Sequence, residues 1–254
     1  MKLKCEMEKL RVLKNMIRTE QDELNLKRIV WKELGVVGEF ETIKQYSYDQ
    51  REINVLLNDL GLLQLITFIR HDELMPEEKK RIKDIQYPSE LYLKFSPGKN
   101  FNIETTALFD RNLNQISMLE KVALWKEAYD KFSFLKISWK KLRIKAQFSD
   151  EWKKSKKHSF DHGTLSIIES PLTYRTDKVF DTLGIETVLR TARADSMRFL
   201  EFSARGFISK QEINKLRKVI NVKRRYLLMT IQKENRKKEG WYLKLTHLSK
   251  LSQL

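Results

Sequence analysis

The chain has 254 residues, of which 41% are hydrophobic and 10% aromatic; this is enough for one large domain or two smaller ones, and it excludes a disordered chain. Only 8 glycines and 4 prolines are present, which argues against a turn-rich β-sandwich and favours long helices joined by a modest sheet. The net charge of +16 is typical of proteins that bind phosphate polymers, anionic lipid surfaces or acidic partners, and charge alone does not choose among them.

The first region, residues 1–85, is predicted to be helical. From Leu3 onward apolar residues recur every three to four positions, which predicts one long helix over residues 3–34 that ends at Gly35 and Gly38. A densely charged helix of this kind suits packing on one face or a short coiled coil, so the pattern also allows a homodimer held by the N-terminal helix.

The N-terminal stretch also bears on location. It is charged throughout and has no apolar signal region, and Cys5, as the only cysteine, permits neither an internal disulfide framework nor a cysteine-rich zinc site. The most apolar run, residues 55–66, is interrupted by polar residues and is too short to span a bilayer. We therefore expect a protein without a membrane span that is not secreted and lies in the cytoplasm, nucleoid or nucleus.

Two further helices are expected before residue 85. The residues Ser47–Gln50 look like a helix start, and the pattern continues to about Ile69. A shorter helix is predicted to open at Met75–Glu78, where Pro76 stands in the first turn and acidic residues favour the positive end of the helix.

Residues 86–175 are predicted to form an α/β region. Around Tyr87 the apolar period changes from 3.6 to 2, and a hairpin is predicted from residues 91–95 and 101–105 around a Ser-Pro-Gly-Lys-Asn turn. A helix is expected over residues 115–131. Three further strands complete a small, mostly antiparallel central sheet, and they are predicted at residues 132–139, 142–148 and 164–168.

The last region, residues 176–254, returns to a helical pattern. One helix is predicted to end at Gly206, and Ser209 with Glu212 forms a capping box that opens a second helix. Asn221 is well suited to a tight turn because asparagine tolerates a positive φ. A third helix is predicted from Lys223 to about residue 239, followed by a strand over residues 241–245.

This C-terminal quarter resembles the winged helix-turn-helix superfamily. The resemblance is carried by apolar positions, by Asn221 in the turn position usually held by glycine, and by a Glu-Gly-aromatic entry to the wing; the apolar positions are Leu216, Ile220, Val222, Leu227 and Ile231. The sequence departs from the superfamily where an alanine is usual early in the second helix, since Asn214 and Lys215 stand there. The third helix is also longer than usual.

The resemblance implies a set of DNA contacts. The third helix of such domains enters the major groove, which would place four residues at base edges, namely Lys223, Arg224, Arg225 and Tyr226, with Thr230 and Lys233 one and two turns further on. Phosphate would be met at the start of the second helix by Ser209, Lys210 and Gln211. Lys244 would lie on the wing.

The distribution of charge supports a binding surface. Residues 198–254 hold 15 Lys and Arg against 4 Asp and Glu, residues 131–157 hold 10 against 2, and the remainder is nearly balanced. In the second block the candidate nucleic-acid ligands are Lys140, Lys141, Arg143, Lys153 and Lys154. The aromatic residues of this block could stack on bases. Equally, they could form the inward face of strands whose outward face carries the cations.

The sequence therefore predicts an α+β protein with a helical N-terminal region, a small central sheet and a C-terminal winged helix. Its expected function is sequence-directed binding of nucleic acid, DNA rather than RNA, as a regulator or replication factor. We expect no cofactor and no metal, since phosphate-loop, dinucleotide and nucleophile-elbow motifs are missing from the sequence, and enzymatic activity is not favoured.

Three alternatives remain open from the sequence. A structural RNA-binding protein, such as a viral nucleoprotein, would use both basic blocks as one groove. A metal-dependent nuclease would use Asp130 and Glu151 as Mg²⁺ ligands with Lys153 near the attacking water. A matrix-like protein would bind anionic membranes.

Overall fold

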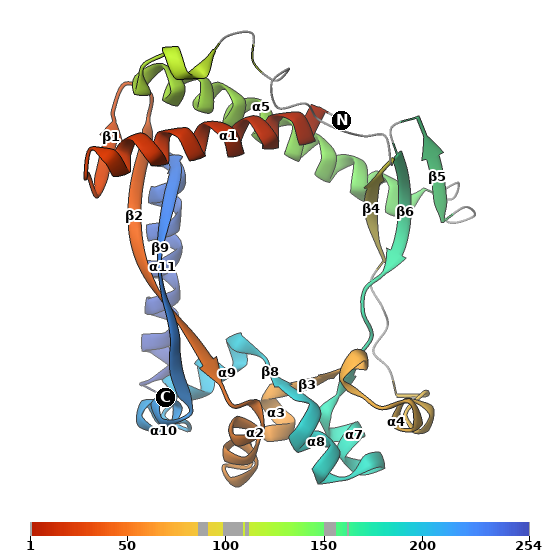
Figure 1. Ribbon diagram of the computed structural model, residues 1–254. Helices are drawn as coiled ribbons and strands as arrows, with labels where there is room; N and C mark the ends of the chain where they lie inside the picture. The colour runs from red at the N-terminus through yellow and green to blue at the C-terminus, as the bar shows by residue number, and fades with distance from the viewer. Residues whose placement is uncertain are drawn as a thin grey trace. The chain divides into compact units, whose positions relative to one another are not determined.

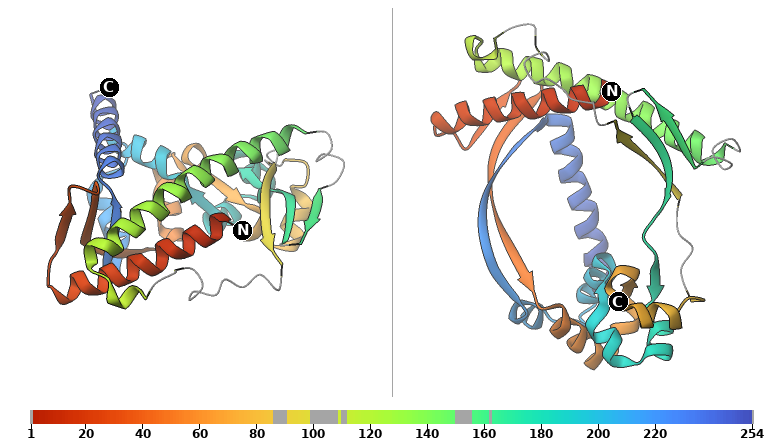
Figure 2. Two further views of the ribbon diagram at one scale, coloured as in Figure 1. Left: turned by 90° about the horizontal axis from the view of Figure 1, so that it is seen from above. Right: turned by 45° about the vertical axis from the view of Figure 1, so that its right-hand side comes forward.

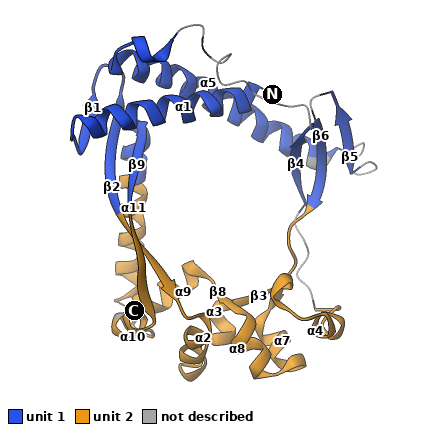
Figure 3. Ribbon diagram, in the orientation of Figure 1, with its two compact units in different colours: residues 1–42, 91–168, 224–237 blue, residues 43–90, 169–223, 238–254 orange. Residues whose placement is uncertain are grey.

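The structure is a computed structural model that describes residues 2–85, 91–98, 109, 112–149, 156–161 and 163–253. The chain divides into two compact units (Figure 3). Unit 1 comprises residues 1–42, 91–168 and 224–237, and unit 2 comprises residues 43–90, 169–223 and 238–254. Each unit thus combines three separate segments, whereas the regions expected from the sequence are contiguous.

Helix α1 (Lys2–Glu23) opens unit 1 and is shorter than predicted. It ends because Asn25 adopts a positive φ of 52°, a left-handed conformation that asparagine tolerates. The predicted helix over residues 3–34 is therefore wrong beyond Glu23. In its place strand β1 (Arg28–Trp31) pairs antiparallel with strand β2 (Val36–Tyr48).

Gly35 ends no helix but lies between the two strands of this pair, where its φ of 61° permits the turn. Arg28 stands opposite Glu39 in the register and forms an ion pair with it at 2.5 Å. A cross-strand pair of opposite charges of this kind helps to fix the register.

Helix α5 (Met118–Phe148) is the longest element of unit 1. Ser117 begins it with a capping box, in which its hydroxyl accepts from the backbone N–H of Glu120. The helix continues through residues 132–139 and 142–148, where two strands were predicted, so both strand predictions are wrong. The alternating apolar residues of this stretch also recur every three to four positions, and Trp139 and Ala146 pack on one sheet.

That sheet has the order β4-β6-β5 and consists of β4 (Leu91–Pro97), β6 (Gly163–Glu169) and β5 (Lys157–Phe160). It confirms the predicted strands at residues 91–95 and 164–168, and β5 pairs antiparallel with β6. The other arm of the predicted hairpin, residues 101–105, lies outside the described residues. Leu93 and Ile167 form a small core with Ala146.

The main core of unit 1 joins segments far apart in the sequence. Helices α1 and α5 lie side by side (Figure 1 and Figure 2). Leu13 and Ile17 of α1 are fully buried, and they pack with Trp125 of α5 and with Tyr226 and other residues of the strands. The apolar face of α1 that suggested dimerisation is therefore covered within the chain. A turn of 3-10 helix, Leu113–Gln115, adds Leu113 to this core.

The C-terminal segment differs from the predicted winged helix. Residues 217–230 form one strand, β9 (Arg217–Thr230), which stands at the edge of the described sheet in the order β1-β2-β9. The predicted turn at Asn221 and the first part of the third helix are thus strand. Among the described non-glycine residues only Asn25 has a positive φ, so Asn221 makes no such turn.

Two physical features of the segment explain the strand. The β-branched residues Val219, Ile220 and Val222 favour extended backbone. From Tyr226 onward the strand enters the core, with Leu228, Met229 and Thr230 also buried. Helix α11 (Ile231–Leu251) follows and runs through residues 239–245, where the helix end and the wing strand were predicted.

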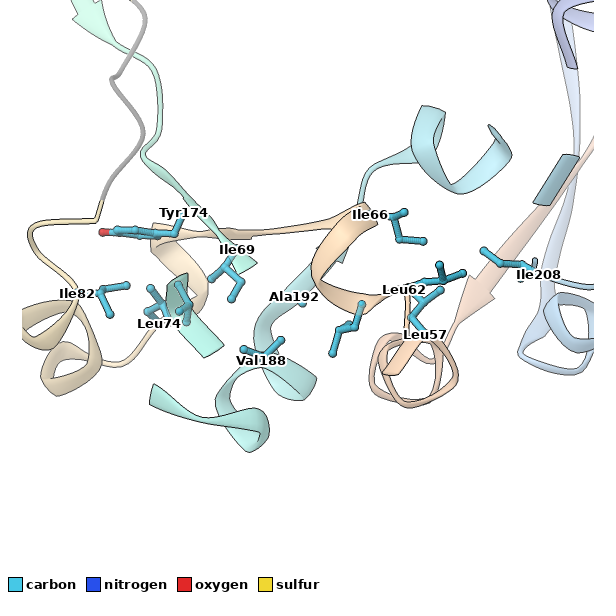
Figure 4. Packing of buried hydrophobic residues seen from close by; sticks show 12 residues of the cluster. Leu57, Leu62, Ile66, Ile69, Leu74, Ile82, Tyr174, Val188, Ala192 and Ile208 are labelled. Carbon is cyan, nitrogen blue, oxygen red and sulfur yellow. The ribbon is translucent and has the colours of Figure 1, made fainter. Parts of the chain in front are cut away.

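Unit 2 is built around a three-stranded antiparallel sheet in the order β7-β3-β8. Its strands are β3 (Thr67–Arg70), β7 (Thr173–Arg175) and β8 (Ala192–Ala194). Short helices surround them: α2 (Gln50–Asp59), α3 (Leu63–Ile66), α4 (Pro76–Arg81), α7 (Thr176–Leu183), α8 (Ile185–Thr191), α9 (Ser196–Ala204) and α10 (Lys210–Lys215), with a 3-10 turn at His71–Glu73. Figure 4 shows the buried residues at its centre, among them Ile66, Ile69 and Val188.

Local signals predicted several boundaries of unit 2. Helix α2 begins within the helix start expected at residues 47–50, with Asp49 as its N-cap. It ends at Asp59 and not at Ile69, because Gly61 has a φ of 68°. The helix at Pro76 is confirmed. The helix end before Gly206 and the capping box of Ser209 with Glu212 are confirmed as well. A fold of helices and small antiparallel sheets is therefore confirmed, and the C-terminal winged helix is not.

Gly38 on β2 provides a test of the unit 1 core. An added Cβ would overlap the Tyr226 hydroxyl and lie 2.6 Å from Oε1 of Gln21. We expect Gly38→Ala to lower the free energy of unfolding by about 1–3 kcal/mol through overpacking. The matched control is Gly240→Ala in α11, where the Cβ meets open space, and it should stabilise by about 0.5–1 kcal/mol. Denaturant titration followed by circular dichroism measures both, and equal effects would contradict the packing argument.

Candidate nucleic-acid interface

The structure divides the residues that were expected to contact DNA between the two units. Five of them belong to unit 2, namely Ser209, Lys210, Gln211, Lys223 and Lys244. Eight belong to unit 1, namely Arg224, Arg225, Tyr226, Thr230, Lys233, Lys140, Lys141 and Arg143. Lys153 and Lys154 lie outside the described residues. The residues of the expected groove-reading helix lie on β9 and at the start of α11, and the cations of the second basic block lie on α5.

The predicted phosphate site at the start of the second helix does not have the expected form. Helix α10 has only six residues, and the hydroxyl of Ser209 accepts from the backbone N–H of Glu212 at 3.1 Å. In return the carboxylate of Glu212 accepts from the backbone N–H of Ser209 at 3.0 Å. Because the cap uses these groups internally, Ser209 has no reason to act as a phosphate ligand.

Two of the expected base-reading side chains are engaged within unit 1. The buried hydroxyl of Tyr226 donates to Oε1 of Gln21 at 2.9 Å, and burial raises the pKa of this hydroxyl well above its usual value. Arg224 forms an ion pair with Asp22, and its guanidinium lies 3.9 Å from the centre of the Phe40 ring. Both residues hold β9 against α1 and β2, so their role here is structural.

Arg225, which lies between Arg224 and Tyr226 on β9, belongs to a group of cations from three elements. This group, which we call the α1–β9–α11 cluster, consists of Lys14 and Arg18 on α1, Arg225 on β9 and Lys233 on α11. Lys14 and Arg18 are one helical turn apart, which places them on neighbouring positions of one face. Lys233 lies in the first turn of α11, and its ammonium group is 5.6 Å from the centre of the Tyr129 ring.

Electrostatic repulsion within the cluster is visible at Lys14. Partial burial lowers the pKa of the Lys14 ammonium, and the charges of Arg225, Arg18 and Lys233 lower it further. The nearby N-terminal end of α11 adds positive potential around Lys233. A bound anion would offset this repulsion.

Two acidic residues lie near the cluster, and one of them pairs with a cluster member while the other pairs with a cation outside it. Glu41 pairs with Arg225 at 2.9 Å, and Glu234 pairs with Arg28 at 3.0 Å. Within the part of the chain that the structure describes, Lys14, Arg18 and Lys233 have no carboxylate within ion-pair distance. The sequence did not indicate that these three cations come close together. The two residues of α1 approach β9 only through contacts that span about two hundred positions, such as the one between Gln21 and Tyr226.

A second basic surface lies on the C-terminal half of α5. Residues 131–148 contain six Lys and Arg and no acidic residue. Lys140, Lys141 and Lys145 are exposed, whereas Arg143 is half-buried and its Nε has no hydrogen-bond partner among the described residues. The aromatic residues of this block are divided, since Trp139 packs inward and Phe134 is 70% exposed.

The nuclease alternative gains no support from this geometry. Asp130 lies in the middle of α5 and not on a strand, and its carboxylate pairs with Lys126. Glu151 and Lys153 lie outside the described residues. Across the described ranges no group of three or more His, Cys, Asp and Glu side chains is arranged to hold a metal ion.

Comparison with known proteins adds no assignment. No protein-family model matches the chain, and neither a curated protein nor a solved structure is significantly similar to it. Of the helices in the described part of the chain, none combines the length and apolar character needed to cross a bilayer.

Lys14 allows a test of the repulsion. Because its lowered pKa means that folding disfavours the charged form, Lys14→Met should raise the free energy of unfolding at neutral pH, by about 0.5 kcal/mol once solvent screening is considered. The part due to like charges should shrink in high salt. Urea unfolding at low and high salt measures the effect, with Lys80→Met on the exposed surface of α4 as control. A loss of stability in low salt would contradict the repulsion.

Proposed function

We propose that this protein binds nucleic acid through phosphate contacts of the α1–β9–α11 cluster, without reading base sequence. The observation that carries the proposal is the convergence of four cations from three elements, three of them without a carboxylate partner among the described residues. Such a site favours a ligand that brings several negative charges close together, and a phosphate backbone does so at regular spacing.

The corrected secondary structure supports contact with phosphate in place of base readout. Side chains reach base edges when an exposed helix or ribbon enters a groove. Here Arg224 and Tyr226 are engaged within unit 1, and the remaining cations are suited to phosphate oxygens. The sequence-directed regulator expected from the sequence needed a helix that reads bases, and residues 217–230 form a strand instead. The proposal is therefore closer to the alternative of a structural RNA-binding protein. The expected preference for DNA over RNA rested on that helix, so both are tested.

A dimer held by the N-terminal helix is not part of the proposal. Leu13, Ile17 and Gln21 of α1 already pack against α5 and β9 in the same chain. A single copy of unit 1 presents the complete cluster, so binding requires no second copy.

We expect the double variant Lys14→Gln/Arg18→Gln to weaken binding to duplex DNA and to single-stranded RNA of mixed sequence. Removing two phosphate contacts should reduce the slope of log K against log salt by about 1.8 for duplex DNA and about 1.4 for single strands. Fluorescence anisotropy across a series of salt concentrations measures both the slope and the affinity. Lys233→Gln alone should produce roughly half of the change.

The charge-matched control is Lys79→Gln/Lys80→Gln, which removes two cations from α4 in unit 2. It should leave the slope unchanged. The proposal fails if the two double variants behave alike, because the effect would then come from net charge and not from the cluster. Competition with unlabelled nucleic acid of a different sequence should displace the probe equally well.

Binding should also take up protons. A phosphate beside Lys14 opposes the burial and repulsion that lower its pKa, so the pKa rises when the complex forms. Affinity should therefore fall as pH rises through the alkaline range toward the ordinary lysine pKa of about 10.4. Calorimetry at alkaline pH, in two buffers of different ionisation enthalpy, measures the uptake. It should disappear in Lys14→Gln, and an uptake that persists there would assign the proton to another group.

A further inference from the structure

The outward side of α5 combines cations with exposed apolar side chains. Phe134 is 70% exposed, Ile137 58% and Ile144 47%. With Lys141 they stand at helical spacings of three, seven and ten residues, which places all four on one face. Lys140 and Lys145 flank that face on its two sides. We call these six residues the outer face of α5.

The opposite side of the same helix is already covered. Trp139 and Ala146 pack against Leu93 and Ile167 of the β4-β6-β5 sheet. The outer face therefore cannot turn inward without removing the helix from this core. Its exposure is a property of the folded unit 1.

The cations of the outer face also differ from those of the first half of the helix. There Lys121 pairs with Glu20, Lys126 with Asp130, and Lys131 with Glu127 at 2.5 Å. By contrast, Lys140, Lys141 and Lys145 have no carboxylate partner among the residues that the structure describes. The cations in the first half of α5 are thus neutralised within the chain, whereas those of the outer face are available to an external anionic partner.

The partner must also accommodate apolar groups. Phe134 is able to stack on a base, but the branched aliphatic side chains of Ile137 and Ile144 have no ring to stack, and a phosphate backbone offers them no apolar environment. An anionic bilayer offers negative headgroups and, a few ångströms deeper, hydrocarbon. This combination matches the outer face more closely than nucleic acid does.

We propose that the outer face of α5 docks on the surface of an anionic lipid bilayer. The helix lies in the plane of the interface, with Phe134, Ile137 and Ile144 inserted at the boundary between headgroups and acyl chains. Lys140, Lys141 and Lys145 contact the anionic headgroups. The β4-β6-β5 sheet stays on the opposite side of the helix, so docking requires no rearrangement of the small core around Ala146.

Co-sedimentation of the full-length chain with vesicles tests the proposal, using phosphatidylcholine alone and phosphatidylcholine mixed with phosphatidylserine. We expect binding only to the mixed vesicles. Lys140→Gln/Lys145→Gln should lower the partition coefficient by about 25-fold, at about fivefold for each lysine near an anionic surface. Phe134→Ser/Ile137→Ser should lower it at least as far, because burial of both side chains is lost.

Insertion has a direct readout. With Cys5→Ser as background, Ile137→Cys is labelled with an environment-sensitive fluorophore, and its emission should shift to the blue on mixed vesicles. The control is Lys80→Cys in the same background, where no shift is expected. Circular dichroism of each variant establishes that the fold is retained.

Three results would overturn the proposal. The first is a failure of the native chain to bind mixed vesicles. The second is unchanged binding of Phe134→Ser/Ile137→Ser, which would make the contact purely electrostatic. The third is concentration-dependent dimerisation that this variant abolishes, because the occupant would then be a second copy of the chain.

The test is independent of the proposed nucleic-acid function. Lys14→Gln/Arg18→Gln should still bind vesicles, and Phe134→Ser/Ile137→Ser should still bind RNA and DNA. Loss of RNA and DNA binding in the latter variant would assign the outer face to nucleic acid and would overturn the lipid proposal. Failure of one proposal therefore leaves the other measurable.

Discussion

The arrangement of unit 1 depends on a buried polar contact between Gln21, Gly38 and Tyr226. The Tyr226 hydroxyl donates to the side-chain oxygen of Gln21, whose Nε2 donates to the carbonyl oxygens of Leu26 at 2.9 Å and of Gly38 at 3.3 Å. Because a buried polar group without a partner is costly, all three chain segments must meet in one register. The close approach is possible only because Gly38 has no side chain. This contact determines which residues of β9 face inward and which, such as Arg225, face outward.

Local signals in the sequence were informative where they involved neighbouring residues. The capping box at Ser209, the first-turn proline Pro76 and the helix start at residues 47–50 all correspond to observed helix starts. These signals depend on side chains that bond to backbone groups a few positions away. Their physics does not require knowledge of the tertiary fold.

The larger errors have one physical origin. Residues 24–34, 132–148 and 217–230 contain apolar residues whose spacing is compatible with either helix or strand, and the choice is made by distant partners. Strand β9 forms beside β2, and the second half of α5 remains helical because Trp139 and Ala146 meet a sheet. The candidate site could be predicted from the sequence only in part, for the same reason. The basic block was visible in the sequence, but the approach of Lys14 and Arg18 to Arg225 follows from pairing across about two hundred positions.

The position of β9 at the edge of its described sheet has a consequence for solubility. An edge strand presents unpaired backbone groups that invite pairing with another chain, and charged side chains on the strand discourage it. Strand β9 carries Arg217, Lys218, Lys223, Arg224 and Arg225 and no acidic residue. Mutual repulsion between such edges opposes the stacking of one molecule on the next. The positive charge of this strand therefore disfavours edge-to-edge pairing between copies, and a polyanion that neutralises it would also remove a barrier to self-association.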